Sequence, residues 1–136
     1  MVSEPIGYIK GDYMRLWHQL LIEKLPRNQL SGQHRECCAL RGNGWGKKHR
    51  IVDYVFTHSP YMLYEYHLLI MAEMTKRGYN IDKLWFSSLY RGKICNPYTY
   101  EELDYEIHDR IIYKEHNTEY LKECLANLLA KCISFD

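Results

Sequence analysis

Hydrophobic positions recur with helical spacing along most of the chain. The longest such stretch begins at Ser59-Pro60 and continues to about Arg77, where Gly78 ends it. Its apolar positions lie almost all round the helix, which is typical of a helix buried at the centre of a protein. These positions are Met62, Leu63, Tyr66, Leu69, Ile70 and Met74. The pattern therefore predicts a central core helix over residues 59–77.

Two further main helices are predicted, one on each side of the central helix in the sequence. Pro26 suits a first helical position and Gly42 follows the other end, so the first helix is expected over residues 26–40. The last helix is expected over about residues 118–132. Its apolar face consists of Leu121, Cys124, Leu125, Leu128 and Cys132.

The remaining segments predict short or irregular structure. A short helix or turn is expected over residues 51–56, and Gly92 and Pro97 punctuate an irregular stretch over residues 85–96. Thr99 could cap another helix, because acidic residues follow in its first turn. No segment predicts a strand. The fold class expected is therefore all-α: a compact single-domain bundle with three main helices and irregular connections.

The composition limits the class of protein. With 136 residues, 46% hydrophobic and 26% charged, the chain is long enough for one globular domain and unlike a disordered protein. No apolar run approaches the roughly 20 residues that span a membrane, and residues 1–12 do not resemble a signal peptide. The five cysteines are an odd number and two are adjacent, which favours a reduced, cytoplasmic compartment.

Charge is distributed unevenly along the chain. Residues 14–50 contain eight Lys or Arg against two acids, a balance of +6, whereas residues 51–136 contain nine against 13, a balance of −4. Such an asymmetry suits a basic face that meets an anion such as nucleic acid. The alternative is ion pairing between the two halves of the chain.

The predicted helix over residues 26–40 carries a candidate site. Gln29, Gln33 and Glu36 recur at helical spacing and share a face, and Arg35 lies beside Glu36. An arginine can hold a phosphate through two hydrogen bonds, and a carboxylate among arginines could stabilise a cation or move a proton. On spacing alone an ordinary surface helix with one weak ion pair is the favoured interpretation.

A glycine-rich segment after this helix becomes strongly basic. Trp45 could stack on a base while Lys47, Lys48, His49 and Arg50 hold phosphates. The equally acceptable alternative is a solvated loop whose tryptophan fills a gap in the core. Lys47 or Lys48 could also supply an amine nucleophile, although neither has apolar neighbours that would desolvate it.

A metal site is the weaker interpretation of the histidines and cysteines. His34 and Cys38 are four residues apart and could share a helix face, and His18, Cys37 and His49 are further candidates. However, the chain has no CxxC pair and no HExxH motif, and adjacent cysteines rarely bind one ion. We therefore expect no metal and no cofactor, and expect the cysteines to be buried soft residues.

Three motifs in order change this balance. Met14-Arg15 is followed by Leu30-Ser31-Gly32-Gln33-His34-Arg35-Glu36 and then by Met74-Thr75-Lys76-Arg77-Gly78-Tyr79-Asn80-Ile81. Over about residues 14–82 the chain resembles the phage endonuclease V family of pyrimidine-dimer DNA glycosylases. The resemblance implies a compact bundle of three main helices that acts as a monomer on damaged double-stranded DNA and flips a nucleotide out of the stack.

The resemblance also implies residue roles. An N-terminal amine attacks the sugar C1′, and the resulting Schiff base permits strand cleavage by β-elimination; this amine matches Met14. The essential glutamate matches Glu36, and the phosphate-binding arginine before it matches Arg35. The arginine just after the nucleophilic residue matches Arg15. The family differs at three places: Gln29 replaces a histidine, Ala39 replaces an arginine, and residues 132–136 lack its aromatic C-terminal segment. The DNA-contacting set expected on and after the helix is Gln29, Gln33, His34, Arg35, Arg41, Trp45, Lys47, Lys48, His49 and Arg50.

A free amine at Met14 requires that translation begin there. Lys10-Gly11-Asp12-Tyr13 could be encoded by a ribosome-binding sequence directly before an ATG, so we expect residues 1–13 to be a mis-annotated extension and residues 14–136 to be the domain. The bulky Arg15 would leave the initiator methionine in place. The alternatives are a non-catalytic nucleic-acid-binding protein, which gains nothing from Glu36, and a structural or protein-interaction domain, which has no use for the +6 segment.

Overall fold

The computed structural model describes residues 15–42, 53–104 and 110–135. In these ranges the ordered elements are helical and no strand occurs, so the predicted all-α class with three main helices is confirmed. The α-helices are α1 (Arg27–Arg41), α2 (Pro60–Lys76), α3 (Tyr100–Leu103) and α4 (Thr118–Ala130). The 3-10 helices are η2 (Gln19–Lys24), η4 (Asp53–Phe56) and η5 (Lys83–Phe86).

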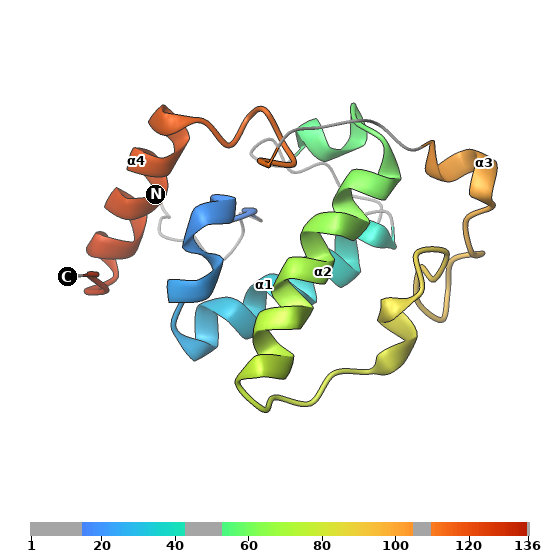
Figure 1. The fold of residues 1–136 in the computed structure, drawn as a ribbon, viewed down its shortest axis with the longest axis horizontal. Coiled ribbons are helices and arrows are strands. Elements are labelled where there is room, and N and C mark those ends of the chain that lie inside the picture. Colours follow the sequence, from blue (N-terminus) through green and yellow to red (C-terminus); the bar gives the residue numbers. More distant parts are fainter. Residues whose placement is uncertain (1–14, 43–52, 105–109, 136) are drawn as a thin grey trace, which may run out of the picture.

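Helix α2 runs through the middle of the molecule and packs against α1, which crosses behind it in Figure 1. On one side of this pair, η2 lies next to α4, so the first described residues meet the last helix. On the other side lie η5 and α3, joined by irregular chain. The site described below lies where α1, the residues before η2, and α4 come together.

The helix ends are set by capping residues that can be recognised in the sequence. Ser59 caps α2, because its side chain accepts a hydrogen bond from the Tyr61 backbone N–H, and Pro60 occupies the first turn. Beyond the other end, Gly78 has φ of +82°, a left-handed conformation that favours glycine. Thr99 and Glu102 form a capping box that starts α3. All three ends agree with the predictions to within a residue or two.

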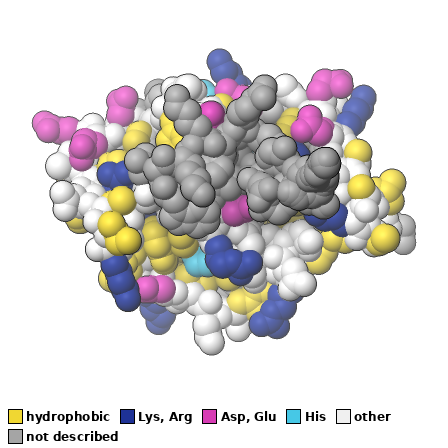
Figure 2. All heavy atoms as spheres, turned by 180° about the vertical axis from the view of Figure 1, so that it is seen from behind, with side chains coloured by type: hydrophobic (Ala, Val, Ile, Leu, Met, Phe, Trp, Pro, Cys, Tyr) yellow, Lys and Arg dark blue, Asp and Glu magenta, His cyan; other side chains and the backbone are white. Residues whose placement is uncertain are grey.

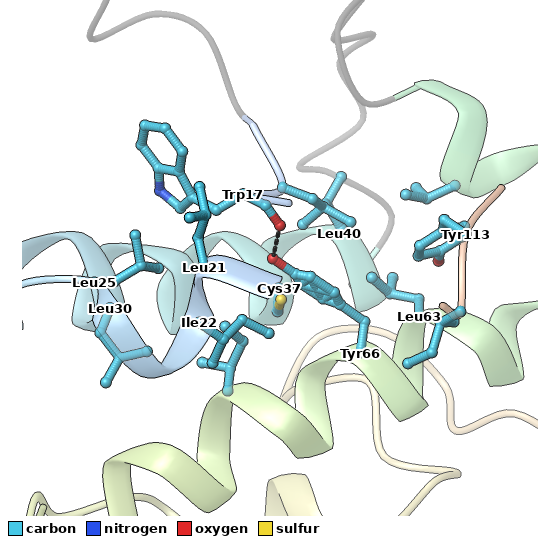
Figure 3. Close-up of a cluster of buried hydrophobic side chains, with 14 of the residues drawn as sticks. Trp17, Leu21, Ile22, Leu25, Leu30, Cys37, Leu40, Leu63, Tyr66 and Tyr113 are labelled. Atoms are coloured by element: carbon cyan, nitrogen blue, oxygen red, sulfur yellow. Dashed lines mark hydrogen bonds between the residues drawn. The ribbon is translucent and has the colours of Figure 1, made fainter. Parts of the chain in front are cut away.

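The core forms between α2, α1 and the chain around η2. Tyr66 of α2 is fully buried, and its hydroxyl hydrogen-bonds the Trp17 carbonyl oxygen at 2.6 Å (Figure 3). Cys37 and Leu40 of α1 are buried in the same cluster. This confirms α2 as the central helix, although Leu69 is 38% exposed, so the helix is not buried all round.

Helix α4 is amphipathic, but its apolar face is narrower than predicted. Cys124 and Leu128 are buried, whereas Leu125 is 40% exposed. Cys132 lies beyond the end of the helix, is exposed, and has φ of +64°. The prediction that Cys132 continues the buried stripe is wrong, because the helix ends at Ala130 before that position is reached. All five cysteines are free thiols.

The Arg41 side chain hydrogen-bonds the irregular chain at and after the end of η5, and so holds it against the end of α1. Its side chain is 2% exposed, and its two terminal nitrogens donate to the carbonyl oxygens of Trp85, Ser87 and Tyr90 at 2.6–2.9 Å. A guanidinium supplies several donors in a fixed plane, so one side chain can bond three carbonyls of a segment that forms no regular helix or strand. None of the described helices is both long enough and apolar enough to cross a membrane.

Candidate functional site

Gln33 of α1 joins that helix to the backbone just before η2. Its Oε1 accepts from the Trp17 N–H at 2.6 Å and lies 2.8 Å from the Tyr66 hydroxyl, and its Nε2 donates to the Arg15 carbonyl oxygen at 2.6 Å. The Trp17 N–H can only donate, so this contact fixes the orientation of the amide. The backbone of Arg15, one residue after Met14, is therefore anchored to α1.

Glu36 receives the remaining bond of this amide. Gln33 Nε2 donates to Glu36 Oε1 at 2.9 Å. Burial raises the pKa of the Glu36 carboxyl to about 7, although the charges of Arg35 and Arg15 and the bond from Gln33 act in the opposite direction. A carboxyl with this pKa can both accept and give up a proton near neutral pH, which an ordinary surface glutamate cannot do.

The Glu36 carboxyl faces a pocket of about 190 Å³, hereafter the Glu36 pocket. Its lining residues come from the chain before η2, from one face of α1, and from α4: Arg15, Trp17, Gln29, Gly32, Gln33, Glu36, Asn127 and Lys131. The structure thus brings together four residues that the sequence proposed as a site, namely Arg15, Gln29, Gln33 and Glu36. One of the four, Arg15, directly follows Met14 in the sequence.

Arg15 is held at the edge of this pocket by several contacts. Its guanidinium carbon lies 5.6 Å from the centre of the Trp17 ring, and its Nη1 donates to Glu123 Oε2 of α4 at 3.3 Å. The Nζ atom of Lys131, at the end of α4, lies 5.7 Å from the centre of the same Trp17 ring. Two cations that line the Glu36 pocket, Arg15 and Lys131, therefore both lie close to the Trp17 ring.

A larger pocket of about 750 Å³ lies on the neighbouring side of α1. It is lined by residues of α1 and of the segment that Arg41 fastens: His34, Arg35, Cys38, Ala39, Gly42, Trp85, Arg91, Gly92, Lys93, Ile94 and Cys95. The consecutive residues Arg35 and Glu36 therefore line different pockets, and Arg35 is exposed. Seen from the face opposite that of Figure 1, Lys and Arg side chains are spread over the surface, with Asp and Glu side chains among them (Figure 2).

His34, Cys38 and His67 bring three possible metal-ligating atoms within 4.8 Å of one another. Arg41 Nη1 can only donate, so its 3.0 Å contact makes His67 Nδ1 an acceptor and places the proton of the neutral ring on Nε2. That proton points to His34 Nδ1 at 2.8 Å. A metal at His67 Nε2 would have to displace the proton and oppose the Arg41 charge. The three side chains fit a hydrogen-bonded chain better than a metal centre.

Several residues that were expected to contact DNA have other partners in the structure. Arg41 and Gln33 are buried and their donors are committed to the protein, so we leave both out of the proposed DNA contacts. His34 faces the larger pocket. Cys37 is buried in the core while Cys38 faces His34, as expected for adjacent helical residues. The predictions for Met14, Trp45, Lys47, Lys48, His49 and Arg50 fall outside the described residues.

The contribution of α4 to the Glu36 pocket was not predicted. Glu123, Asn127 and Lys131 are spaced four residues apart and so form a polar stripe beside the apolar face of the helix. That stripe is visible in the sequence. However, nothing in the sequence places it against Arg15, because the two segments are more than a hundred residues apart.

Comparison with known families gives one match. The family model described as pyrimidine dimer DNA glycosylase matches residues 14–87, a segment that begins at Met14 and includes α1 and α2. The chain belongs to this family, as its sequence motifs indicated. Comparisons with curated proteins and with solved structures gave no match. Helix α4 lies outside the matched segment.

Proposed function

We propose that this protein is a DNA glycosylase with abasic-site lyase activity that excises a damaged pyrimidine through an imine formed by the amine of Met14. The observation that carries the proposal is the half-buried Glu36 carboxyl in a pocket that also contains Arg15, the residue after Met14. Membership of the pyrimidine dimer DNA glycosylase family supports the substrate class.

The first step is attack of a neutral amine on C1′ of the target sugar. A free α-amine has a pKa of about 8, so a useful fraction is neutral near pH 7, unlike a typical lysine. The new N–C1′ bond replaces the bond between C1′ and the base, and the base leaves with the bonding electron pair and takes up a proton. Loss of the amine proton and opening of the sugar ring give the imine. This step requires that translation begin at Met14.

Glu36 serves both halves of the reaction. In its ionised form the carboxylate stabilises the positive charge that develops on the sugar. After the imine has formed, it can accept the proton from C2′, and the 3′ phosphate then leaves by β-elimination. Its pKa of about 7 suits both roles, because a large fraction is ionised at neutral pH and the carboxylate is a stronger base toward the C2′ proton than an ordinary glutamate.

The cations around the pocket would hold the DNA backbone. Arg15 lies at the edge of the Glu36 pocket and Arg35 is exposed one position before Glu36. Guanidinium groups bind phosphates through paired, charge-assisted hydrogen bonds. The exposed basic side chains would add the salt-dependent part of the affinity for double-stranded DNA.

A strand-cleavage assay tests this function. We would express a chain that starts at Met14, incubate it with ultraviolet-irradiated duplex and with duplex carrying one abasic site, and separate the strands on a denaturing gel. We expect nicks at dimers and at abasic sites, and at least about a hundredfold slower cleavage by Glu36→Gln. Salt-sensitive DNA binding without cleavage, unchanged by Glu36→Gln, would instead identify a non-catalytic DNA-binding protein.

A further inference from the structure

Helix α4 is attached to the Glu36 pocket by several independent contacts, although it lies outside the segment that matches the family. Tyr120 donates to the Leu16 carbonyl oxygen at 2.6 Å, and Cys124 is buried in the core. Asn127 and Lys131 line the pocket itself. The helix is therefore a wall of the site, and its polar residues act on the same side chains that would meet DNA.

The contact between Glu123 and Arg15 resembles the contact that a phosphate would make. The Glu123 Oε2 atom accepts one hydrogen bond from Arg15 Nη1 at 3.3 Å. The Arg15 side chain is 15% exposed and is fixed over Trp17, whereas the Glu123 side chain is 61% exposed and can turn into solvent. A carboxylate and a phosphate are both anions that accept from a guanidinium, so a DNA phosphate and Glu123 compete for the same donor.

We propose that Glu123 is a positioning residue: it holds the Arg15 guanidinium at the Glu36 pocket in the free protein and yields it to a DNA phosphate on binding. This inference rests on the proposed function, because it takes DNA as the ligand. It adds a role for α4, whose carboxylate weakens binding to every duplex by occupying Arg15 beforehand. Once DNA is bound, Glu123 no longer contacts Arg15 and has no part in the chemistry.

The exchange of Glu123 for a DNA phosphate at Arg15 should be detectable in how DNA affinity depends on salt concentration. A cation that is free in the unbound protein gains one phosphate contact and releases counterions from DNA, which adds about 0.9 to the slope of log affinity against log salt concentration. A cation already paired with a carboxylate gains less, because one ion pair replaces another. Removing the Glu123 charge should therefore steepen the slope by up to about one and strengthen binding at low salt.

Binding would be measured for Glu123→Gln with a duplex that carries a tetrahydrofuran abasic analogue, at several NaCl concentrations. Glu119→Gln is the matched control: Glu119 is on the same helix, is 84% exposed, and pairs loosely with Lys122 at 3.9 Å. We expect Glu123→Gln to bind several-fold more tightly than the parent at low salt, with the steeper slope. In cleavage of abasic duplex, we expect its KM to fall while kcat stays within about twofold.

The same substitution in an Arg15→Gln background separates exchange from general repulsion. If Glu123 acts through Arg15, Glu123→Gln has no effect on binding or slope in that background. An equal gain from Glu119→Gln, or a gain that persists without Arg15, would overturn the inference and leave only repulsion between acids and DNA. If the parent protein binds the duplex and Arg15→Gln weakens binding but Glu123→Gln leaves the affinity unchanged, the inference fails and the proposed function stands. A parent protein without DNA binding contradicts both.

Discussion

Glu36 is the residue whose surroundings differ most from the sequence-based interpretation. Its helical spacing from Gln29 and Gln33 is plain in the sequence, and all three line one pocket. The sequence could not show that Gln33 is buried with its amide satisfied by the protein, because its partners Trp17 and Tyr66 come from distant segments. Nor could it show that burial outweighs two nearby arginines and raises the pKa of Glu36.

Glu36→Gln should stabilise the protein at alkaline pH. The folded state raises the pKa of this carboxyl from its usual value of 4.5 to about 7, so it holds the proton more tightly than the unfolded chain. The ionised form therefore destabilises the fold. This effect is absent below about pH 4.5, grows as the pH rises, and is complete above about pH 7.

Urea unfolding at pH 8 and at pH 4.5 measures this effect. We expect Glu36→Gln to raise the free energy of unfolding by up to about 3 kcal/mol at pH 8 and by little at pH 4.5. Gln29→Glu is the control, because position 29 lies on the same helix face, is partly exposed, and has no carboxyl in the native protein. A Glu36→Gln variant that is equally destabilised at both pH values would show that the carboxylate is favourable in the fold.

At the scale of elements, the caps and the apolar spacing made the main helices predictable. Ser59, Gly78 and Thr99 act locally, so their effects can be deduced from neighbouring residues. The hydrogen bonds that hold the segment after η5 against α1 are not local and could not be predicted in this way. Arg41 was predicted to contact DNA because it is a cation near a basic helix, but its bonds go to carbonyls 44 to 49 residues away.

Arg41→Lys should therefore damage the fold rather than DNA binding alone. A lysine cannot supply donors in the planar arrangement that reaches three carbonyls, so buried acceptors would lose their partners. We expect a loss of about 2–4 kcal/mol in the free energy of unfolding by urea. Arg35→Lys, at an exposed position on the same helix, should change stability by less than about 0.5 kcal/mol. Equal stabilities for the two variants would contradict the structural role of Arg41.

On the scale of the whole molecule, charge asymmetry had two interpretations, and the structure contains elements of both. Arg15 of the basic half pairs with Glu123 of the acidic half. Arg35 remains exposed. Figure 2 shows further Lys and Arg side chains on the surface. The packing of α4 against residues 15–17 is what the sequence could not supply, because hydrophobic spacing predicts helices and not which helices meet.

The two titratable groups of the proposed site, the Glu36 carboxyl and the Met14 amine, predict how activity depends on pH. A carboxyl with pKa of about 7 and an α-amine with a pKa of about 8 both act in their deprotonated forms in the first step. We expect kcat/KM for abasic duplex to rise from about pH 6 to about pH 9, roughly one unit above the pKa of the amine, and then to level off. Glu36→Asp, measured over the same range, should be slower and should show a shifted lower limb if Glu36 contributes it. A profile that falls from pH 6 upward would contradict these assignments.

The central claim is that an amine at Met14 reaches the site of Glu36 and Arg15, and borohydride trapping on abasic duplex tests it most directly. For a chain that starts at Met14, we predict a covalent protein–DNA adduct whose mass-spectrometric position is the Met14 amine. Acetylation of that amine should abolish the adduct, and Glu36→Gln should impair the reaction. An adduct located on a lysine, or no adduct from the folded Met14-start protein, would contradict the claim.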